Sequence, residues 1–179
     1  NTSPQTLFYE NLKEKNKKAG ATRLDYKFFL GVGSDNLNNI NDLLDNPQLN
    51  VAGLKVYYGQ STGNMIFSDL SKLNHINKNA IIVFHSEDQC CINENTKKYN
   101  HKIKNKKDFI IHSQIRSSKA ALTSSKKILK WALQEKRKIH LAHISTPEEV
   151  DLIHKYKELG LEVSCEVAAH HLFFCEDDY

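Results

Sequence analysis

Three side chains that could together hold metal stand at or near the ends of predicted strands: Lys55, His85 and His143. Neutral imidazoles are good zinc ligands. A lysine beside them would repel a metal while it is a cation, but carbamylation of its amine gives an anion whose two oxygens can bridge a pair of metals. A strand-end lysine that extends its amine into solvent is an equally good interpretation of Lys55 from the sequence alone. The three residues therefore predict a metal site that depends on this modification.

His143 has the clearest local setting. The segment 139–144 is apolar apart from two histidines, which predicts a short buried strand. A Ser-Thr pair can then cap a helix whose first residue is Pro147. This rim, where a strand ends and a helix begins, is where parallel α/β folds build their sites. A single histidine here would more often be structural, but the arrangement recurs at two upstream strands. His140 has the opposite strand parity, should lie nearer the amino end and is expected to be structural.

Strand and helix patterns alternate along the whole chain, without hairpin signals. Apolar runs predict five strands, at 25–32, 51–57, 80–84, 139–143 and 161–167. This alternation is typical of parallel βα units, so the fold class is α/β. An open doubly wound sheet and part of a (β/α)₈ barrel both fit the pattern. No GxGxxG or P-loop motif supports the nucleotide-binding versions of the open sheet.

The spacing of the three candidate ligands fits the repeat of a barrel. Lys55 and His85 are 30 residues apart, and His85 and His143 are 58 residues apart. A barrel of about 250 residues allows roughly thirty residues per unit. The first step is then one unit, and the second is one unit lengthened by the irregular, basic connection 100–115. Three adjacent strands would direct the three side chains to one point.

Composition favours a single globular domain over residues 1–179, with 40% hydrophobic and 26% charged residues. No apolar run approaches the roughly 20 residues of a membrane span and no signal peptide opens the chain, so we expect a cytoplasmic protein. The net charge of +4 comes from dispersed lysines, which argues against nucleic-acid and membrane partners. Four cysteines without CxxC spacing predict reduced, mostly buried thiols. A zinc knot of Cys165, His170, His171 and Cys175 is the less favoured alternative.

Six segments carry a recognisable pattern in a fixed order. They are NTSPQT at 1–6, GLKVY at 53–57 with STGN at 61–64, FHSED at 84–88, HSQIRS at 112–117, the histidine strand at 140–150 and CEVAAHHLF at 165–173. Together they resemble the dihydroorotases, of the cyclic amidohydrolase superfamily, over nearly the whole chain. Each motif is weak alone, but six in the correct order are highly specific. The departures from the family pattern, at Ser113, Lys119 and 168–169, touch no presumed metal ligand.

The resemblance implies part of a (β/α)₈ barrel of the metal-dependent hydrolase type. The implied reaction is the zinc-dependent, reversible hydrolysis of dihydroorotate to N-carbamoyl-L-aspartate in pyrimidine synthesis. Carboxylated Lys55 would bridge two zinc ions, and His85 and His143 would ligate one of them. An activated hydroxide would attack the ring amide carbonyl while a metal stabilises the developing oxyanion. Asn1 would bind the substrate carboxylate, and the loop around Thr62 would close over the ring.

Other motifs of the family lie outside the 179 residues. The HxHxR motif would precede Asn1, and the aspartate that serves as general base would follow Tyr179. We therefore expect an internal fragment that contains no catalytic base and is inactive alone. The substrates of the full-length protein would be small molecules, and it would bind neither nucleic acid nor a membrane. It would form a homodimer or associate with aspartate transcarbamoylase.

Two other functions fit the sequence less well. Another cyclic amidohydrolase, such as a hydantoinase or allantoinase, is disfavoured by the NTSPQT and CEVAAHHLF segments. A non-catalytic dihydroorotase-like scaffold is disfavoured because Lys55, His85 and His143 are all present.

Overall fold

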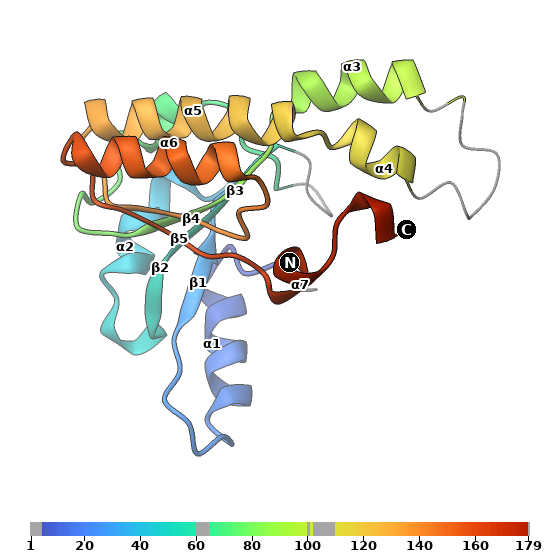
Figure 1. Ribbon diagram of the computed structural model, residues 1–179. Coiled ribbons are helices and arrows are strands. Elements are labelled where there is room, and N and C mark those ends of the chain that lie inside the picture. The colour runs from blue at the N-terminus through green and yellow to red at the C-terminus, as the bar shows by residue number, and fades with distance from the viewer. Residues whose placement is uncertain (1–4, 60–64, 100, 102–109, 179) are drawn as a thin grey trace.

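A parallel sheet forms the centre of the structure. The computed structural model describes residues 5–59, 65–99, 101 and 110–178 (Figure 1). The strands are β1 (Phe28–Gly31), β2 (Val51–Tyr58), β3 (Ile82–Ser86), β4 (Ile139–Leu141) and β5 (Val163–Cys165). Every neighbouring pair is parallel, and the order across the sheet is the order along the chain. A doubly wound sheet reverses its strand order at a switch point. The observed order is that of a barrel segment, so the predicted partial (β/α)₈ fold is confirmed.

Helices and short 3₁₀ turns connect the strands. The helices are α1 (Tyr9–Ala19), α2 (Ile40–Leu44), α3 (Gln89–Tyr99), α4 (Ile110–Ile115), α5 (Ser118–Gln134), α6 (Pro147–Glu158) and α7 (Ala169–Phe173). The 3₁₀ turns are η1 (Leu37–Asn39), η2 (Pro47–Leu49), η3 (Leu70–Leu73) and η5 (Glu176–Asp178). Helices α5 and α6 lie side by side over one face of the sheet (Figure 1). None of the described helices is both long and apolar enough to cross a membrane.

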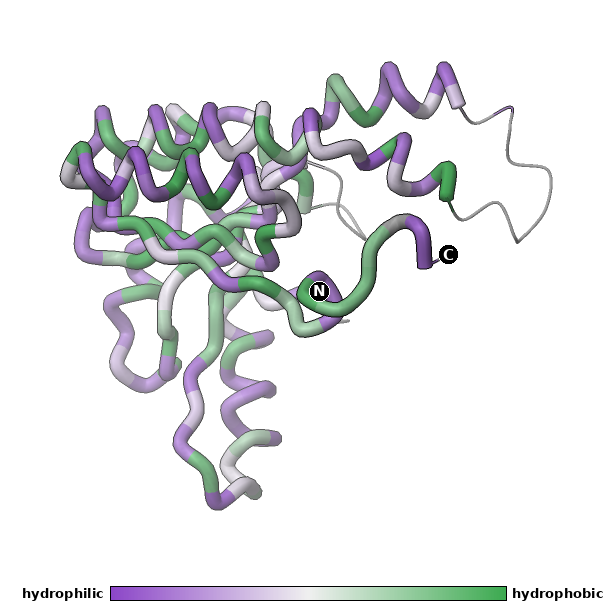
Figure 2. The backbone as a smooth tube through the Cα atoms, in the orientation of Figure 1, coloured by the Kyte–Doolittle hydropathy of each residue, from purple (hydrophilic) through white to green (hydrophobic). Residues whose placement is uncertain are grey.

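The two faces of the sheet differ in polarity. On β2, Leu54 and Val56 are fully buried, whereas Lys55 and Tyr57 on the other face remain partly exposed. Successive strand residues point to opposite faces, so the buried residues pack toward the helices. Figure 2 shows hydrophobic residues along the strands and on parts of the covering helices. The opposite face therefore carries the polar side chains that could form a site.

The connection 100–115 was expected to be irregular, and this is wrong for its last part. Helix α4 occupies residues 110–115, and Ile111 is buried. Asn95 on α3 donates a hydrogen bond to the carbonyl of Ile115 at 3.1 Å. The helix is stabilised by packing against α3, which its short sequence does not reveal.

The four cysteines are free, as predicted, but the expectation that they are mostly buried is wrong. Cys90, Cys165 and Cys175 are exposed and Cys91 is half-buried. Cys165 ends β5, which has no further strand beside it among the described residues. Its side chain therefore lacks the cover that an interior strand would have.

Candidate metal centre

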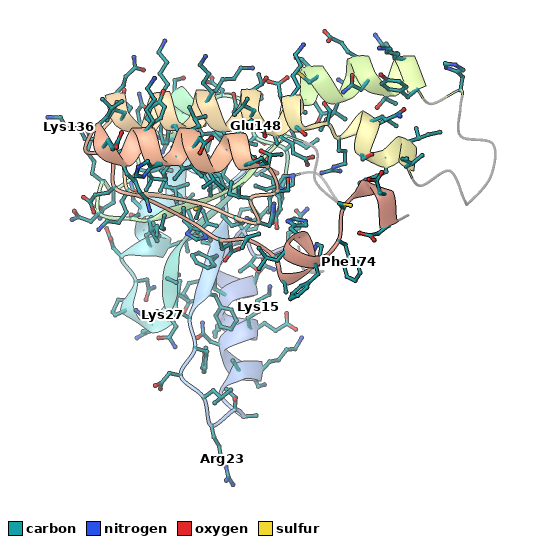
Figure 3. The ribbon with its side chains drawn as sticks, viewed as in Figure 1. Lys15, Arg23, Lys27, Lys136, Glu148 and Phe174 are labelled. Atoms are coloured by element: carbon teal, nitrogen blue, oxygen red, sulfur yellow. The ribbon has the colours of Figure 1, made fainter. Side chains whose placement is uncertain are left out.

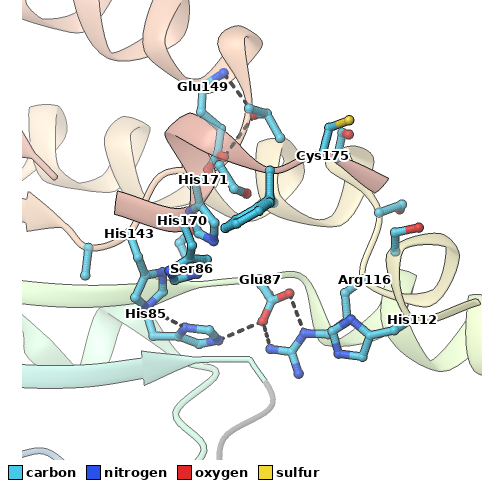
Figure 4. Close-up of a pocket in the computed structure, with 18 of the residues that line it drawn as sticks. His85, Ser86, Glu87, His112, Arg116, His143, Glu149, His170, His171 and Cys175 are labelled. Carbon is cyan, nitrogen blue, oxygen red and sulfur yellow. Dashed lines mark hydrogen bonds and ion pairs between the residues drawn. The ribbon is translucent and has the colours of Figure 1, made fainter. Parts of the chain in front are cut away.

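Two histidines from neighbouring strands meet at the carboxyl end of the sheet. His85 is on β3, and His143 follows β4. The Nδ1 atom of His85 lies 3.1 Å from the Nε2 atom of His143, with the ring centroids 4.9 Å apart (Figure 4). Two nitrogens bound to one tetrahedral zinc at ~2.0–2.1 Å would be about 3.3 Å apart. The pair therefore fits two ligands of one metal ion.

A left-handed turn brings His143 to this position. Its φ is 43°, a region that non-glycine residues seldom adopt. The turn is held on both sides, because Ala142 donates its N–H to the Phe84 carbonyl and Ile144 donates to the Glu166 carbonyl, at 3.0 and 2.7 Å. Backbone conformations of this kind cluster at functional sites.

The electrostatic surroundings favour neutral imidazole at His143. Although part of the residue stays exposed, partial burial lowers its pKa. Electrostatic interactions with His85 and Lys55 lower this pKa further, while Glu166 acts in the opposite direction. The neutral ring is the form that binds a metal ion.

Lys55 lies on the same sheet face as His85, one strand away. It pairs in register with Val83, two residues before His85. Its Nζ atom is 5.4 Å from the centroid of the Tyr57 ring. Burial lowers the pKa of Lys55, although Glu166 raises it in part. A lowered pKa increases the fraction of neutral amine, which is the form that reacts with carbon dioxide.

The lysine and the two histidines line different cavities. His85 and His143 line a cavity of about 680 Å³, and Lys55 lines a smaller one of about 370 Å³ together with Tyr57. Among the described residues, no three His, Cys, Asp or Glu side chains converge on a metal position. A third ligand from Lys55 therefore stays a prediction that depends on its modification.

The structure adds Glu87 and Arg116 to the site, which the sequence did not single out. Glu87 Oε2 lies 2.8 Å from His85 Nε2 (Figure 4). Arg116 donates from Nε to Glu87 Oε1 at 2.9 Å and from Nη2 to Oε2. Burial raises the pKa of Glu87, but its hydrogen bonds with His85 and Arg116 outweigh burial and hold it below the ordinary value. The available signal was the place of Glu87 in FHSED, two residues after the histidine.

His140 does not lie where its parity predicts. It is nearer the amino end than His143, as expected, but its register with Val83 places it on the sheet face of Lys55. The left-handed turn at His143 interrupts the alternation, so an odd spacing no longer means opposite faces. His140 Nδ1 is 2.9 Å from the Ser164 hydroxyl.

Of the other predicted site residues, two are not described and four do not form a metal site. Asn1 and Thr62 lie outside the described residues. His170 and His171 pack edge to face at 4.3 Å, and the nearby cysteines are exposed. The zinc knot, the less favoured alternative, finds no metal-binding group among the described residues.

Parallel strands in sequential order, with two histidines at the carboxyl end of the sheet, define the class of the fold as part of an α/β barrel. The L-hydantoinase (dihydropyrimidinase) from Arthrobacter aurescens has a TM-score of 0.86 at 23% identity, covering 99% of this chain and 40% of that one. The inactive dihydroorotase-like domain of the Chaetomium thermophilum CAD-like multifunctional protein has a TM-score of 0.63 at 20% identity, covering 97% and 41%. Identities this low show the fold alone.

Sequence relatives point to the dihydroorotases. The chain is 28% identical to the dihydroorotase of Methanosphaera stadtmanae over 180 residues, covering 100% of this chain and 40% of that protein. It is 33% identical to multifunctional protein CAD of Squalus acanthias over 186 residues, covering 99% of this chain and 6% of that protein. No protein-family model matches. The resemblance to the dihydroorotases is confirmed, and the chain spans less than half of these relatives.

Proposed function

We propose that the chain is the central part of a zinc-dependent dihydroorotase, which interconverts dihydroorotate and N-carbamoyl-L-aspartate. The observation that carries this proposal is the 3.1 Å approach of His85 Nδ1 to His143 Nε2 at the carboxyl end of the sheet. It occurs in a chain similar along its length to a dihydroorotase. Residues 1–179 would form one domain of a cytoplasmic enzyme of pyrimidine synthesis.

His85 and His143 would hold one zinc ion, and Lys55 would bridge it to a second. The neutral amine of Lys55 attacks the carbon of carbon dioxide; a C–N bond forms, one C=O electron pair moves to oxygen, and an N–H proton leaves to solvent. The resulting carbamate would carry a negative charge and two oxygens that could ligate metal. When bound, the metal pair supplies the Lewis acidity that activates water and polarises the ring amide carbonyl.

The remaining roles rest on the resemblance. Asn1 would bind the substrate carboxylate, and the loop around Thr62 would close over the ring. We assign no general base within the 179 residues. The full-length protein would form a homodimer or associate with another enzyme such as aspartate transcarbamoylase. The relative in Squalus acanthias is named a multifunctional protein, which supports the association. We propose no nucleic-acid or membrane partner.

A substrate comparison tests the proposed function. The natural full-length protein is loaded with zinc, and ring opening of dihydroorotate, a hydantoin and allantoin is measured before and after chelation. We expect zinc-dependent turnover of dihydroorotate in both directions and little turnover of the other two rings.

Two outcomes would favour the alternatives. Turnover of hydantoin without turnover of dihydroorotate would identify a hydantoinase, the function named for the structure with a TM-score of 0.86. Bound zinc without turnover of any ring would favour a non-catalytic scaffold, in line with the inactive domain that shares the fold.

A further inference from the structure

We propose that Glu87, held by Arg116, is a positioning residue that selects the tautomer and the orientation of His85 for metal binding. This inference rests on the proposed function, because it concerns the metal that His85 and His143 would hold. It assigns to Glu87 and Arg116 a role in metal affinity rather than contact with the substrate.

The position of Glu87 is fixed by its backbone. Its N–H donates to the Tyr58 carbonyl at 2.9 Å, which ties the end of β3 to the end of β2. Gly59 lies so close that a Cβ on it would overlap the backbone of Glu87. The Glu87 side chain is 14% exposed, so neighbouring residues restrict its position.

Arg116 reaches Glu87 from the short connection between α4 and α5, which α3 holds by hydrogen bonds. It lies between α4 and α5, where Asn95 of α3 donates to the Ile115 carbonyl at 3.1 Å and to the Ser117 hydroxyl at 3.2 Å. Its guanidinium contacts both carboxylate oxygens, a two-point geometry that sets the plane of the carboxylate. Arginine remains protonated in proteins. Glu87 is therefore kept as an anion that can only accept hydrogen bonds.

An acceptor-only partner determines which nitrogen of His85 carries the proton. Glu87 Oε2 lies 2.8 Å from Nε2, close enough to require a hydrogen on that atom. The contact has the distance of an ion pair without regular hydrogen-bond angles, and Nε2 has no regular hydrogen bond to any of the described residues. With Nε2 protonated, the lone pair of His85 is on Nδ1, the atom that faces His143. Carboxylates fix ligand histidines in this way at metal sites.

The tautomer can be measured without any metal. Nitrogen-15 NMR of the histidine rings distinguishes Nε2-protonated from Nδ1-protonated imidazole in the metal-free natural protein. We expect His85 to be Nε2-protonated in the wild type. In Glu87→Gln, whose amide can also donate, this preference should weaken or reverse. A wild-type His85 protonated on Nδ1 would overturn the inference, whether or not the protein binds zinc.

Metal affinity supplies the second readout. Competition with a chelator should show zinc binding weakened about 10- to 100-fold in Glu87→Gln. Arg116→Lys, which keeps the charge but loses the two-point contact, should have a smaller effect. The matched control is Asp88→Asn, because Asp88 is the adjacent carboxylate but pairs with Lys127 instead. Each metal-free variant is first compared with wild type by thermal unfolding, so that lost affinity is not mistaken for lost structure.

His85→Ala separates this inference from the proposed function. If His85→Ala loses zinc while Glu87→Gln binds it as tightly as wild type, the metal site stands and the positioning role is wrong. If His85→Ala and wild type bind zinc equally, the metal site itself is wrong, and the tautomer measurement still decides what Glu87 does to His85.

Discussion

At the scale of single residues, the central question is how a lysine, which is normally a cation, can take part in a site that binds metal cations. Lys55 is half-buried on the sheet face of His85, and its charge lowers the pKa of His143. As an ammonium group it would repel a metal ion held by His85 and His143. As a carbamate it would supply the negative charge that two imidazoles lack.

Two substitutions of Lys55 test the carbamate. Lys55→Ala in the full-length protein should lose most zinc and turnover, with partial recovery when short carboxylic acids are added. Lys55→Arg should not recover, because arginine keeps its positive charge and cannot take up carbon dioxide to bridge zinc. Zinc per chain and ring opening are the measurements. Full activity in Lys55→Arg would refute the carbamate.

Replacing His143 and replacing His140 should differ in their effect on metal content. His143→Ala should lose zinc, because its Nε2 is one of the two converging nitrogens. His140→Ala should retain wild-type zinc, because His140 Nδ1 is already engaged by Ser164. Zinc per chain, measured after dialysis, compares the two variants. Equal losses would show that His140 is a ligand and not a structural residue.

At the scale of elements, the ends of β2 and β3 must approach closely for the site to form. Gly59 has a φ of 120°, and a Cβ at this position would overlap the Glu87 backbone. Gly160 has a φ of 87°, but a Cβ there would meet nothing within 4 Å. Both glycines have a positive φ that would strain alanine, but they differ in the space around them.

This pair gives a matched prediction for stability and metal affinity. Gly160→Ala should cost about 1 kcal/mol through strain alone. Gly59→Ala should cost about 2–3 kcal/mol, because strain and overlap add, and should weaken zinc binding by displacing Glu87. Urea unfolding and chelator competition measure the two effects. If Gly59→Ala binds zinc as tightly as wild type, the close approach of β2 and β3 is not needed for metal binding.

The elements show what the sequence could and could not predict. The mainly apolar segment 51–57 and the uninterrupted apolar run 80–84 predicted strands, so Lys55 and His85 could be placed at or near strand ends. The left-handed turn at His143 has no sequence signature, because such turns usually use glycine or asparagine. The contact between Glu87 and Arg116 joins residues 29 positions apart and depends on the packing of α3 and α4. Local patterns carry no information about such packing.

At the scale of the whole molecule, the described part of the chain leaves apolar surface uncovered. β1 and β5 form the two edges of the sheet, without a further strand beside them among the described residues. Leu172, Phe173 and Phe174, in and after α7, are 68%, 79% and 68% exposed. Figure 3 shows Phe174 projecting from this terminal segment. Unpaired edges and exposed aromatic side chains promote association between chains.

The 179 residues expressed alone should therefore behave poorly. We expect aggregation in size-exclusion chromatography, little zinc per chain and no ring opening of dihydroorotate. The full-length protein, purified in parallel, is the control. A monomer of 179 residues that holds two zinc ions and turns over dihydroorotate would show that the placement of the site is wrong.

The most direct test of the metal centre is anomalous diffraction at the zinc absorption edge, from crystals of the full-length protein grown with zinc. The account predicts a zinc peak within about 2.0–2.1 Å of both His85 Nδ1 and His143 Nε2. A second peak should be joined to it through a carbamate on Lys55. Zinc bound elsewhere, with the two imidazole nitrogens hydrogen-bonded to each other, would contradict the account.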